Sequence, residues 1–172
     1  MRDSSTHFPH VDEPASVTTA RLWHCKFRTV APLGDLHLLE GLDVATFHDA
    51  SLTPLERLTR LRYLRLVHLP EVSDLGPLGC LQNLEVLHLS TLPSWDASGK
   101  TTEIESLARL ARMPALRHLE LFGVHPPDRS LSALEPCVSL VSVRVSGYPL
   151  HEVERFRRAT GLDNAFAPHP WF

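Results

Sequence analysis

Little in the sequence suits a disulfide-stabilised, membrane-spanning or nucleic-acid-binding protein. Its three cysteines, Cys25, Cys80 and Cys137, lie far apart and lack the close pairs of a zinc site or a disulfide framework. No apolar run approaches the roughly 20 residues that span a bilayer. The net charge of −3 provides no basic field to attract nucleic acid or an anionic membrane. We therefore expect reduced thiols, and neither nucleic acid nor a membrane as a partner.

The first 16 residues also lack the apolar centre of a secretory signal, so we expect a cytoplasmic protein in which residues 1–16 form a flexible arm. The rest of the chain, with 43% hydrophobic residues overall, suffices for one domain with a substantial core. We place this domain at residues 17–161 and treat residues 162–172 as a C-terminal tail.

What the sequence does contain is a repeat, in which an apolar residue is followed at +3 and +5 by two more. The copies are Leu22/Cys25/Phe27, Leu39/Leu42/Val44, Leu61/Leu64/Leu66, Leu84/Leu87/Leu89, Leu116/Leu119/Leu121 and Leu140/Val143/Val145. Their first positions are 17, 22, 23, 32 and 24 residues apart. Between Leu61 and Leu84 the later apolar residues recur at every third position, which is typical of 3₁₀-like or extended turns, whereas the triplet suits a short strand. Each unit therefore predicts one turn of a coil.

This pattern resembles the leucine-rich repeat family, specifically the short repeats of about 22 residues in internalin-like bacterial proteins, over about residues 22–153. The resemblance implies an α/β fold: a leucine-rich repeat solenoid of about six repeats, with a parallel sheet on the concave face and 3₁₀ or short helices on the convex face. The family usually places Asn or Cys three residues after the last strand leucine, where the side chain bonds the backbone of the turn. The corresponding residues here are Val30, Phe47, Leu69, Leu92, Val124 and Tyr148. We therefore expect apolar packing to hold the turns.

Residues 150–160, LHEVERFRRAT, carry the signature of a capping helix at the end of the coil. Leu150, Val153 and Phe156 fall at helical spacing with charges on the opposite side, and Gly161 follows as a C-cap. The final AFAPHPWF cannot continue this helix because it contains two prolines. It either folds back to cover the coil or hangs free.

The stretch SWDASGKT, residues 94–101, raises the alternative of a nucleotide-binding P-loop, since Gly-Lys-Thr follows a predicted strand. A P-loop needs a glycine where this chain has Ser94, and it works in a sheet covered by helices rather than in one turn of a coil. We interpret residues 93–101 instead as a loop inserted into the 32-residue unit, at the rim of the concave sheet. Trp95 there is either an anchor that holds the loop down or a partly exposed binding residue.

Thr102 and Glu105 after this loop form a capping-box pattern. The pattern predicts a helix of about ten residues. The side chains expected on its inner face are Ile104, Leu107 and Leu110.

Residues that alternate with the buried strand leucines point outward from the concave face. The central column is Lys26, Asp43, Arg65, His88, Glu120 and Arg144. The flanking columns are His24, Gly41, Tyr63, Val86, His118 and Ser142 on one side and Arg28, Ala45, Val67, Ser90, Phe122 and Ser146 on the other. Charges of alternating sign beside aromatic and imidazole groups suit a partner interface with aromatic anchors, although they also fit a solvated face whose charges neutralise one another.

From these columns and the rim loop we predict a set of partner-binding residues whose side chains project away from the core. They are Lys26, Asp43, Tyr63, Arg65, His88, Trp95, His118, Glu120, Phe122 and Arg144.

Metal and catalytic sites find less support in the sequence. His88 and His118 fall on adjacent strands one column apart, but no third ligand of certain position accompanies them unless Glu120 serves. The strand serines lack a motif such as G-x-S-x-G, and the spacing places no His and Asp pair beside them. We expect no metal, no cofactor and no catalytic residue.

The family resemblance implies a non-enzymatic protein–protein interaction module that binds a partner protein through its concave face. A short chain without a targeting segment fits a soluble inhibitor or an immunity-type protein. A structural adaptor or scaffold is one alternative, and an enzyme or nucleotide-binding protein is another. The periodicity alone indicates only the fold.

Overall fold

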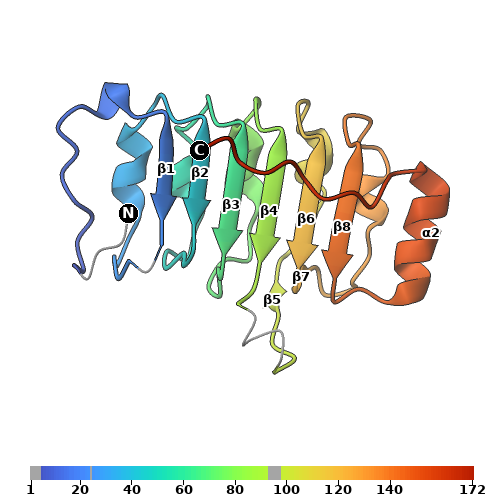
Figure 1. Ribbon diagram of the computed structural model, residues 1–172. Coiled ribbons are helices and arrows are strands. Elements are labelled where there is room, and N and C mark those ends of the chain that lie inside the picture. The colour runs from blue at the N-terminus through green and yellow to red at the C-terminus, as the bar shows by residue number, and fades with distance from the viewer. Residues whose placement is uncertain (1–4, 24, 93–97) are drawn as a thin grey trace.

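Six short strands form one parallel sheet in which the order of the strands follows the chain (Figure 1). The computed structural model describes residues 5–23, 25–92 and 98–172. The strands are β1 (Thr19–Leu22), β2 (Gly41–Val44), β3 (Tyr63–Val67), β4 (Val86–Ser90), β6 (His118–Phe122) and β8 (Ser142–Ser146). Equivalent residues of successive repeats are paired across neighbouring strands, as with Leu64 and Leu87. The predicted leucine-rich repeat solenoid is confirmed.

The side of the coil opposite the sheet is built from short 3₁₀ helices. They are η2 (Ala31–Asp35), η3 (Thr53–Leu55), η4 (Gly76–Cys80), η5 (Leu110–Arg112) and η6 (Ser132–Leu134), with η1 (Pro14–Ser16) before the first strand. In the second unit, the N–H groups of Leu55, Leu58 and Leu61 each donate to the carbonyl of the buried leucine three positions earlier. A 3₁₀ helix has three residues per turn, so the apolar period of three keeps one side of each segment inside the coil.

The first unit is the one place where the predicted strand register is wrong. β1 ends at Leu22, and Leu22 pairs with Val44, so the first triplet is Val17/Ala20/Leu22 rather than Leu22/Cys25/Phe27. Val17 lies 22 residues before Leu39, which is the regular spacing of the repeat. The anomalous spacing of 17 was the sign of the misalignment.

Apolar packing holds the turns after the strands, as predicted, because Phe47, Leu69 and Val124 are fully buried there. The backbone supplies hydrogen bonds between the repeats: the Phe47 N–H donates to the His68 carbonyl, and the His68 N–H donates to the Ser90 carbonyl. With the corrected register, Cys25 occupies the turn position of the first unit. Its thiol donates to the carbonyl of Trp23 at 3.6 Å, so one turn does carry the polar contact expected of the family.

The 32-residue unit does not contain the helix that the capping-box pattern predicts. Thr102 and Glu103 form strand β5, which pairs with β7 (Val124–His125) in a second, two-stranded parallel sheet. The Thr102 N–H donates to the carbonyl of Gly123, so a neighbouring repeat competes successfully with a local helix cap. The side chains predicted to face the interior do so, since Ile104, Leu107 and Leu110 are buried.

Helix α2 (Leu150–Thr160) closes the far end of the sheet, and Gly161 ends it in the left-handed conformation at a φ of 68°. Phe156 is buried against the last repeat, whereas Leu150 at the start of the helix is 72% exposed. The Glu152 carboxylate accepts hydrogen bonds from the Leu131 N–H at 2.7 Å and from Arg155. The contact with Leu131 joins the helix to the segment that begins η6.

The opposite end of the coil receives part of the segment that precedes β1. Phe8 packs against Phe27 with ring centroids 5.3 Å apart, and the Arg28 N–H donates to the carbonyl of Thr6. Cys80 and Cys137 are free thiols, as expected, and Cys80 is exposed. Within the described residues, no helix has the length and apolar character needed to cross a bilayer.

Candidate functional site

The sheet brings eight of the ten predicted residues onto one face. The central row runs across the strands as Arg21, Asp43, Arg65, His88, Glu120 and Arg144, because successive members are register partners. Tyr63 and His118 lie in one flanking row, and Phe122 lies in the other. The strands are parallel and in register, so residues 20 or more positions apart in sequence become direct neighbours.

Two predicted residues do not belong to this group. Lys26 lies beyond the end of β1 and is exposed, and Arg21 occupies the place in the row that we assigned to it. The shift of the first strand by five residues is the cause. Trp95 lies outside the described residues, as does His24, which we had placed in a flanking column.

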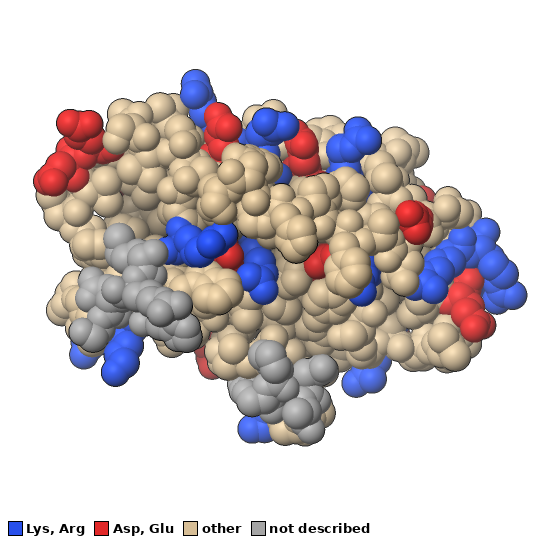
Figure 2. All heavy atoms as spheres, viewed as in Figure 1, with Lys and Arg blue, Asp and Glu red and all other residues tan. Residues whose placement is uncertain are grey.

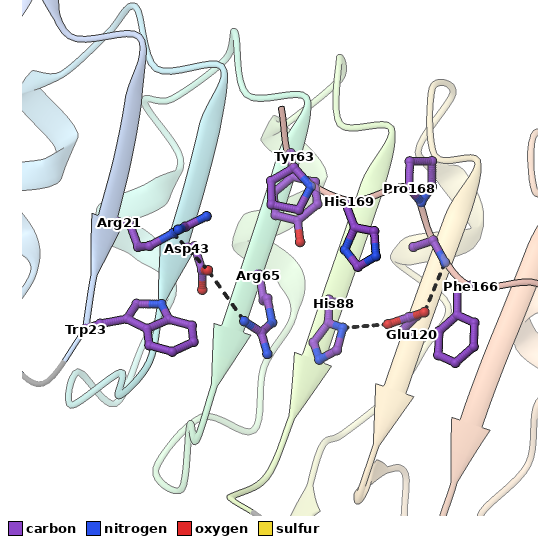
Figure 3. Close-up of a pocket in the computed structure, with 12 residues that line it drawn as sticks. Arg21, Trp23, Asp43, Tyr63, Arg65, His88, Glu120, Phe166, Pro168 and His169 are labelled. Carbon is purple, nitrogen blue, oxygen red and sulfur yellow. Dashed lines mark hydrogen bonds and ion pairs between the residues drawn. The ribbon is translucent and has the colours of Figure 1, made fainter. Parts of the chain in front are cut away.

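One cluster in the row centres on Asp43, whose side chain is only 3% exposed. Its Oδ2 atom lies 3.6 Å from Arg21 Nε and 3.5 Å from Arg65 Nη1, so two guanidinium groups flank one carboxylate (Figure 3). The second oxygen, Oδ1, is buried and has no hydrogen-bond partner among the described residues. A buried carboxylate oxygen in this state favours any hydrogen-bond donor that can reach it.

The second cluster centres on Glu120. Its Oε2 atom lies 2.6 Å from His88 Nδ1, and Arg144 Nη1 lies 3.9 Å from the other oxygen. Burial alone would raise the pKa of Glu120, but the hydrogen bonds from His88 and from the Ala167 N–H, with the charges of His88 and Arg144, outweigh it and hold the pKa below its usual value. Glu120 is therefore a carboxylate at neutral pH, able to accept hydrogen bonds from a bound chain.

The chain itself supplies a bound segment, because residues 162–172, the tail, lie across the concave face. The tail leaves α2 and crosses the front of the sheet in the reverse direction, towards β2 (Figure 1). It starts with a parallel bridge between Asp163 and Ser142. Of the two courses that the sequence left open, folding back is therefore the one observed.

The tail covers part of the predicted set of partner-binding residues, although the side chains that it covers do project away from the core. Tyr63 is only 5% exposed, since the rings of Trp171 and Phe172 pack against its edge with centroids 6.2 and 5.9 Å away. Burial raises the pKa of Tyr63. In the space-filling view, charged atoms show only in small patches along the middle of this face (Figure 2).

Between the tail and the sheet lies a cavity of about 350 Å³. Its floor carries both charge clusters and the aromatic rings of Trp23 and Tyr63, while residues 166–170 form its roof (Figure 3). Sequence analysis missed Arg21, Trp23 and the whole roof. The regular 22-residue spacing could have located Arg21, but no periodicity marks the tail.

Another contact on this face joins a histidine to a serine: His118 Nδ1 lies 2.8 Å from Ser142 Oγ. Burial, with a contribution from the charge of Arg117, lowers the pKa of His118 and so favours the neutral ring. Ser142 is only 2% exposed, so its hydroxyl is not placed to attack a substrate. Across the described ranges, no three His, Cys, Asp or Glu side chains are grouped to hold a metal ion.

The segment that raised the P-loop alternative does not form such a loop in its described part. Lys100 is exposed, and after it the chain enters β5, a strand of the small second sheet, rather than a helix. A P-loop requires a helix at this point, since the helix N-terminus contributes to phosphate binding. The lysine therefore lacks the surroundings in which it would contact a nucleotide.

No protein-family model matches the sequence, and no curated protein sequence matches it either. Solved structures do match. The chain is similar to internalin C2 of Listeria monocytogenes, with a TM-score of 0.63 and 26% identity over 77% of this chain and 53% of that one. Internalin F of the same organism matches with a TM-score of 0.56 and 20% identity, over 80% of this chain and 38% of that one. The chain thus spans about half or less of the internalins that it matches. Its fold is a leucine-rich repeat solenoid similar to theirs.

Proposed function

We propose that this protein is a non-enzymatic binding module that recognises another protein through the concave face of its sheet. The observation that carries the proposal is the central row, in which charged groups of both signs are fixed at neighbouring register positions. A coil stabilised by its apolar interior does not need charges on this face. Fixed charges beside aromatic rings are, however, what a specific protein interface uses.

The finer proposal is that the module is a soluble inhibitor or an immunity-type protein that occludes one partner. The continuous concave face supports this role, because one such face covers one partner surface. An adaptor that joins two proteins would need a second surface. Within the described residues, the turn that leads into β5 projects beyond the end of the main sheet (Figure 1).

The proposal is tested with matched baits in extracts of the source cells. Wild-type protein should retain a partner that the Arg65→Ala variant loses, because Arg65 lies in the central row. Arg60→Ala, at an exposed position outside the strands, should retain the partner as the wild type does. Equal retention by all three baits, or loss with Arg60→Ala alone, would place recognition elsewhere on the molecule.

A further inference from the structure

The tail is held on the concave face almost entirely by side chains of the sheet, and its contacts describe a groove. After its bridge to β8 it crosses the strands instead of pairing along them. Two main-chain groups are bound further on: the Ala167 N–H donates to Glu120 Oε1 at 3.0 Å, and the Phe172 carbonyl accepts from Arg21 Nη2 at 2.9 Å. Main-chain contacts of this kind recognise an extended backbone whatever its sequence.

Aromatic side chains of the tail provide the anchors at each end of the groove. The Arg144 guanidinium carbon lies 3.3 Å from the centroid of the Phe166 ring. At the other end, Arg62 and Arg21 lie over the rings of Trp171 and Phe172, at 5.5 Å in each case. Arginine held over an aromatic face is a favourable contact that partial desolvation strengthens.

The Phe172 ring packs against β2 at Gly41, where the strand has no side chain. A β-carbon at this position would clash with the Phe172 ring. At the equivalent register positions of β3 and β4, Tyr63 and Val86 do carry side chains. This position of the repeat therefore accepts a side chain. Gly41 thus opens a place for an aromatic ring on the sheet.

The tail nevertheless fits this groove incompletely. Phe166 remains 74% exposed and Trp171 remains 55% exposed. Between these anchors the tail spans the cavity of about 350 Å³ without a donor for the buried Oδ1 atom of Asp43. A segment that buried its anchors more fully and offered that donor would bind better than the tail.

We propose that the concave face is a groove for an extended partner segment with aromatic anchors, and that the tail is an internal competitor that such a segment displaces. This proposal rests on the proposed function, since it names the chemistry of the partner at the same face. The two prolines of the tail, Pro168 and Pro170, suit the role because each removes an N–H donor and stiffens an extended chain.

The test uses the full chain and a fluorescent synthetic peptide with the sequence of residues 162–172. The face is opened by the double substitution Phe166→Ala/Phe172→Ala, which alters only the tail. This variant should bind the peptide on the order of tenfold more tightly than wild-type protein, because a tethered competitor acts at an effective concentration near millimolar. Fluorescence anisotropy measures both affinities.

The matched control adds Gly41→Leu to the opened variant. The leucine side chain occupies the space on β2 in which the Phe172 ring packs. The gain in peptide affinity should then disappear, while thermal unfolding shows that the coil remains folded. A peptide with alanine in place of Phe166 and Phe172 should bind none of the proteins measurably. Equal peptide affinity for the wild-type and opened proteins, or a gain that survives Gly41→Leu, would overturn the proposal.

The outcome is independent of whether a natural partner is found. Peptide binding to the opened variant without any partner that depends on Arg65 would preserve the groove and refute the proposed function. A partner whose binding depends on Arg65, together with a peptide that binds no variant, would support the proposed function and refute the groove.

Discussion

The interior of the coil and its concave face are built from the same strands but follow different rules. In β3, Leu64 and Leu66 point inward and are fully buried, while Tyr63 and Arg65 point to the concave face. The inward positions are almost uniformly leucine or valine from unit to unit. The concave positions change at every unit, and charges of both signs alternate among them.

The difference shows that stability and recognition are separated within single strands. Each interior leucine packs between the units before and after it, so its contribution is local and repeated. The charge clusters on the concave face also depend on the tail, since Glu120 binds Ala167, 47 residues later in the chain. Substitutions inside the coil should therefore affect unfolding, and substitutions on the concave face should affect binding.

The largest expected effect is on the interior side of this comparison. Leu64→Ala should lower the free energy of unfolding by about 2–5 kcal/mol, because it removes a fully buried side chain between two neighbouring strands. Urea denaturation measures the loss. Arg60→Ala, at an exposed position outside the strands, is the control and should change the same free energy by less than about 0.5 kcal/mol. A loss of similar size from both would mean that the interior is not close-packed at β3.

On the concave side, Arg65→Ala or Phe122→Ala should each weaken binding of the partner by about 2 kcal/mol, since central arginine and aromatic residues usually dominate an interface. Isothermal calorimetry against the recovered partner provides the measurement. Arg109→Ala on the convex side should bind normally. The comparison breaks down if the convex substitution weakens binding and the concave substitutions do not.

The capping helix α2 contains a charged group, Glu152, that contributes to stability rather than to the concave face. Hydrogen bonds from Arg155 and the Leu131 N–H lower the pKa of Glu152 from 4.5 to about 2, even though burial opposes the change. A carboxyl with a lowered pKa stabilises the fold above its unfolded pKa, and this stabilisation is lost as pH falls from about 4.5 towards 2.

Removing that carboxylate should therefore flatten the acid side of the stability profile. Glu152→Gln should lower the melting temperature at pH 6 by about 2–4 °C, the value expected for a charged hydrogen bond on the order of 1 kcal/mol in a chain of this size. At pH 2 the variant and the wild type should differ much less. Calorimetric melts at both pH values measure the two differences, and a constant difference would assign the effect to packing instead.

The smallest effect is expected at the rim, which belongs to neither side of the comparison. Lys100→Ala should leave the melting temperature unchanged within error, because the side chain is exposed. Titration with a labelled nucleotide should show no binding before or after the substitution. A measurable affinity that the substitution removes would restore the nucleotide-binding alternative.

The fold was predictable because its signal is repeated along the chain. Residues such as Leu64 and Leu87 play one structural role in successive units, so an error at one unit leaves the others aligned. The error at the first unit arose since Leu22, Cys25 and Phe27 satisfy the apolar pattern by chance, although β1 ends at Leu22. Strand pairing with β2, which the local sequence does not encode, decides between the two registers.

Local patterns were less reliable where two structures competed for the same backbone groups. The Thr102 capping box satisfies helix rules, but the Thr102 N–H bonds Gly123 of the next repeat instead. The candidate site was predictable only as a row of positions on a face. Its cover was not, because the contact between Phe172 and Gly41 joins residues 131 positions apart without any periodic signal.

The hydrogen bonds between buried residues three positions apart determine where this coil accepts a change in length. One added residue in a 3₁₀ segment would rotate every later side chain by about 120° and move a leucine from the interior to solvent. The natural variation avoids these segments: from the residue whose carbonyl accepts the first of these hydrogen bonds to the first inward-facing residue of the next strand the chain advances 12 residues, as from Val30 to Leu42, Leu52 to Leu64 and Leu131 to Val143. All differences in repeat length therefore lie between a strand and the 3₁₀ segment that follows it. Those connections are where the coil accepts added length, outside buried turn residues such as Phe47 and Leu69 that hold neighbouring repeats together.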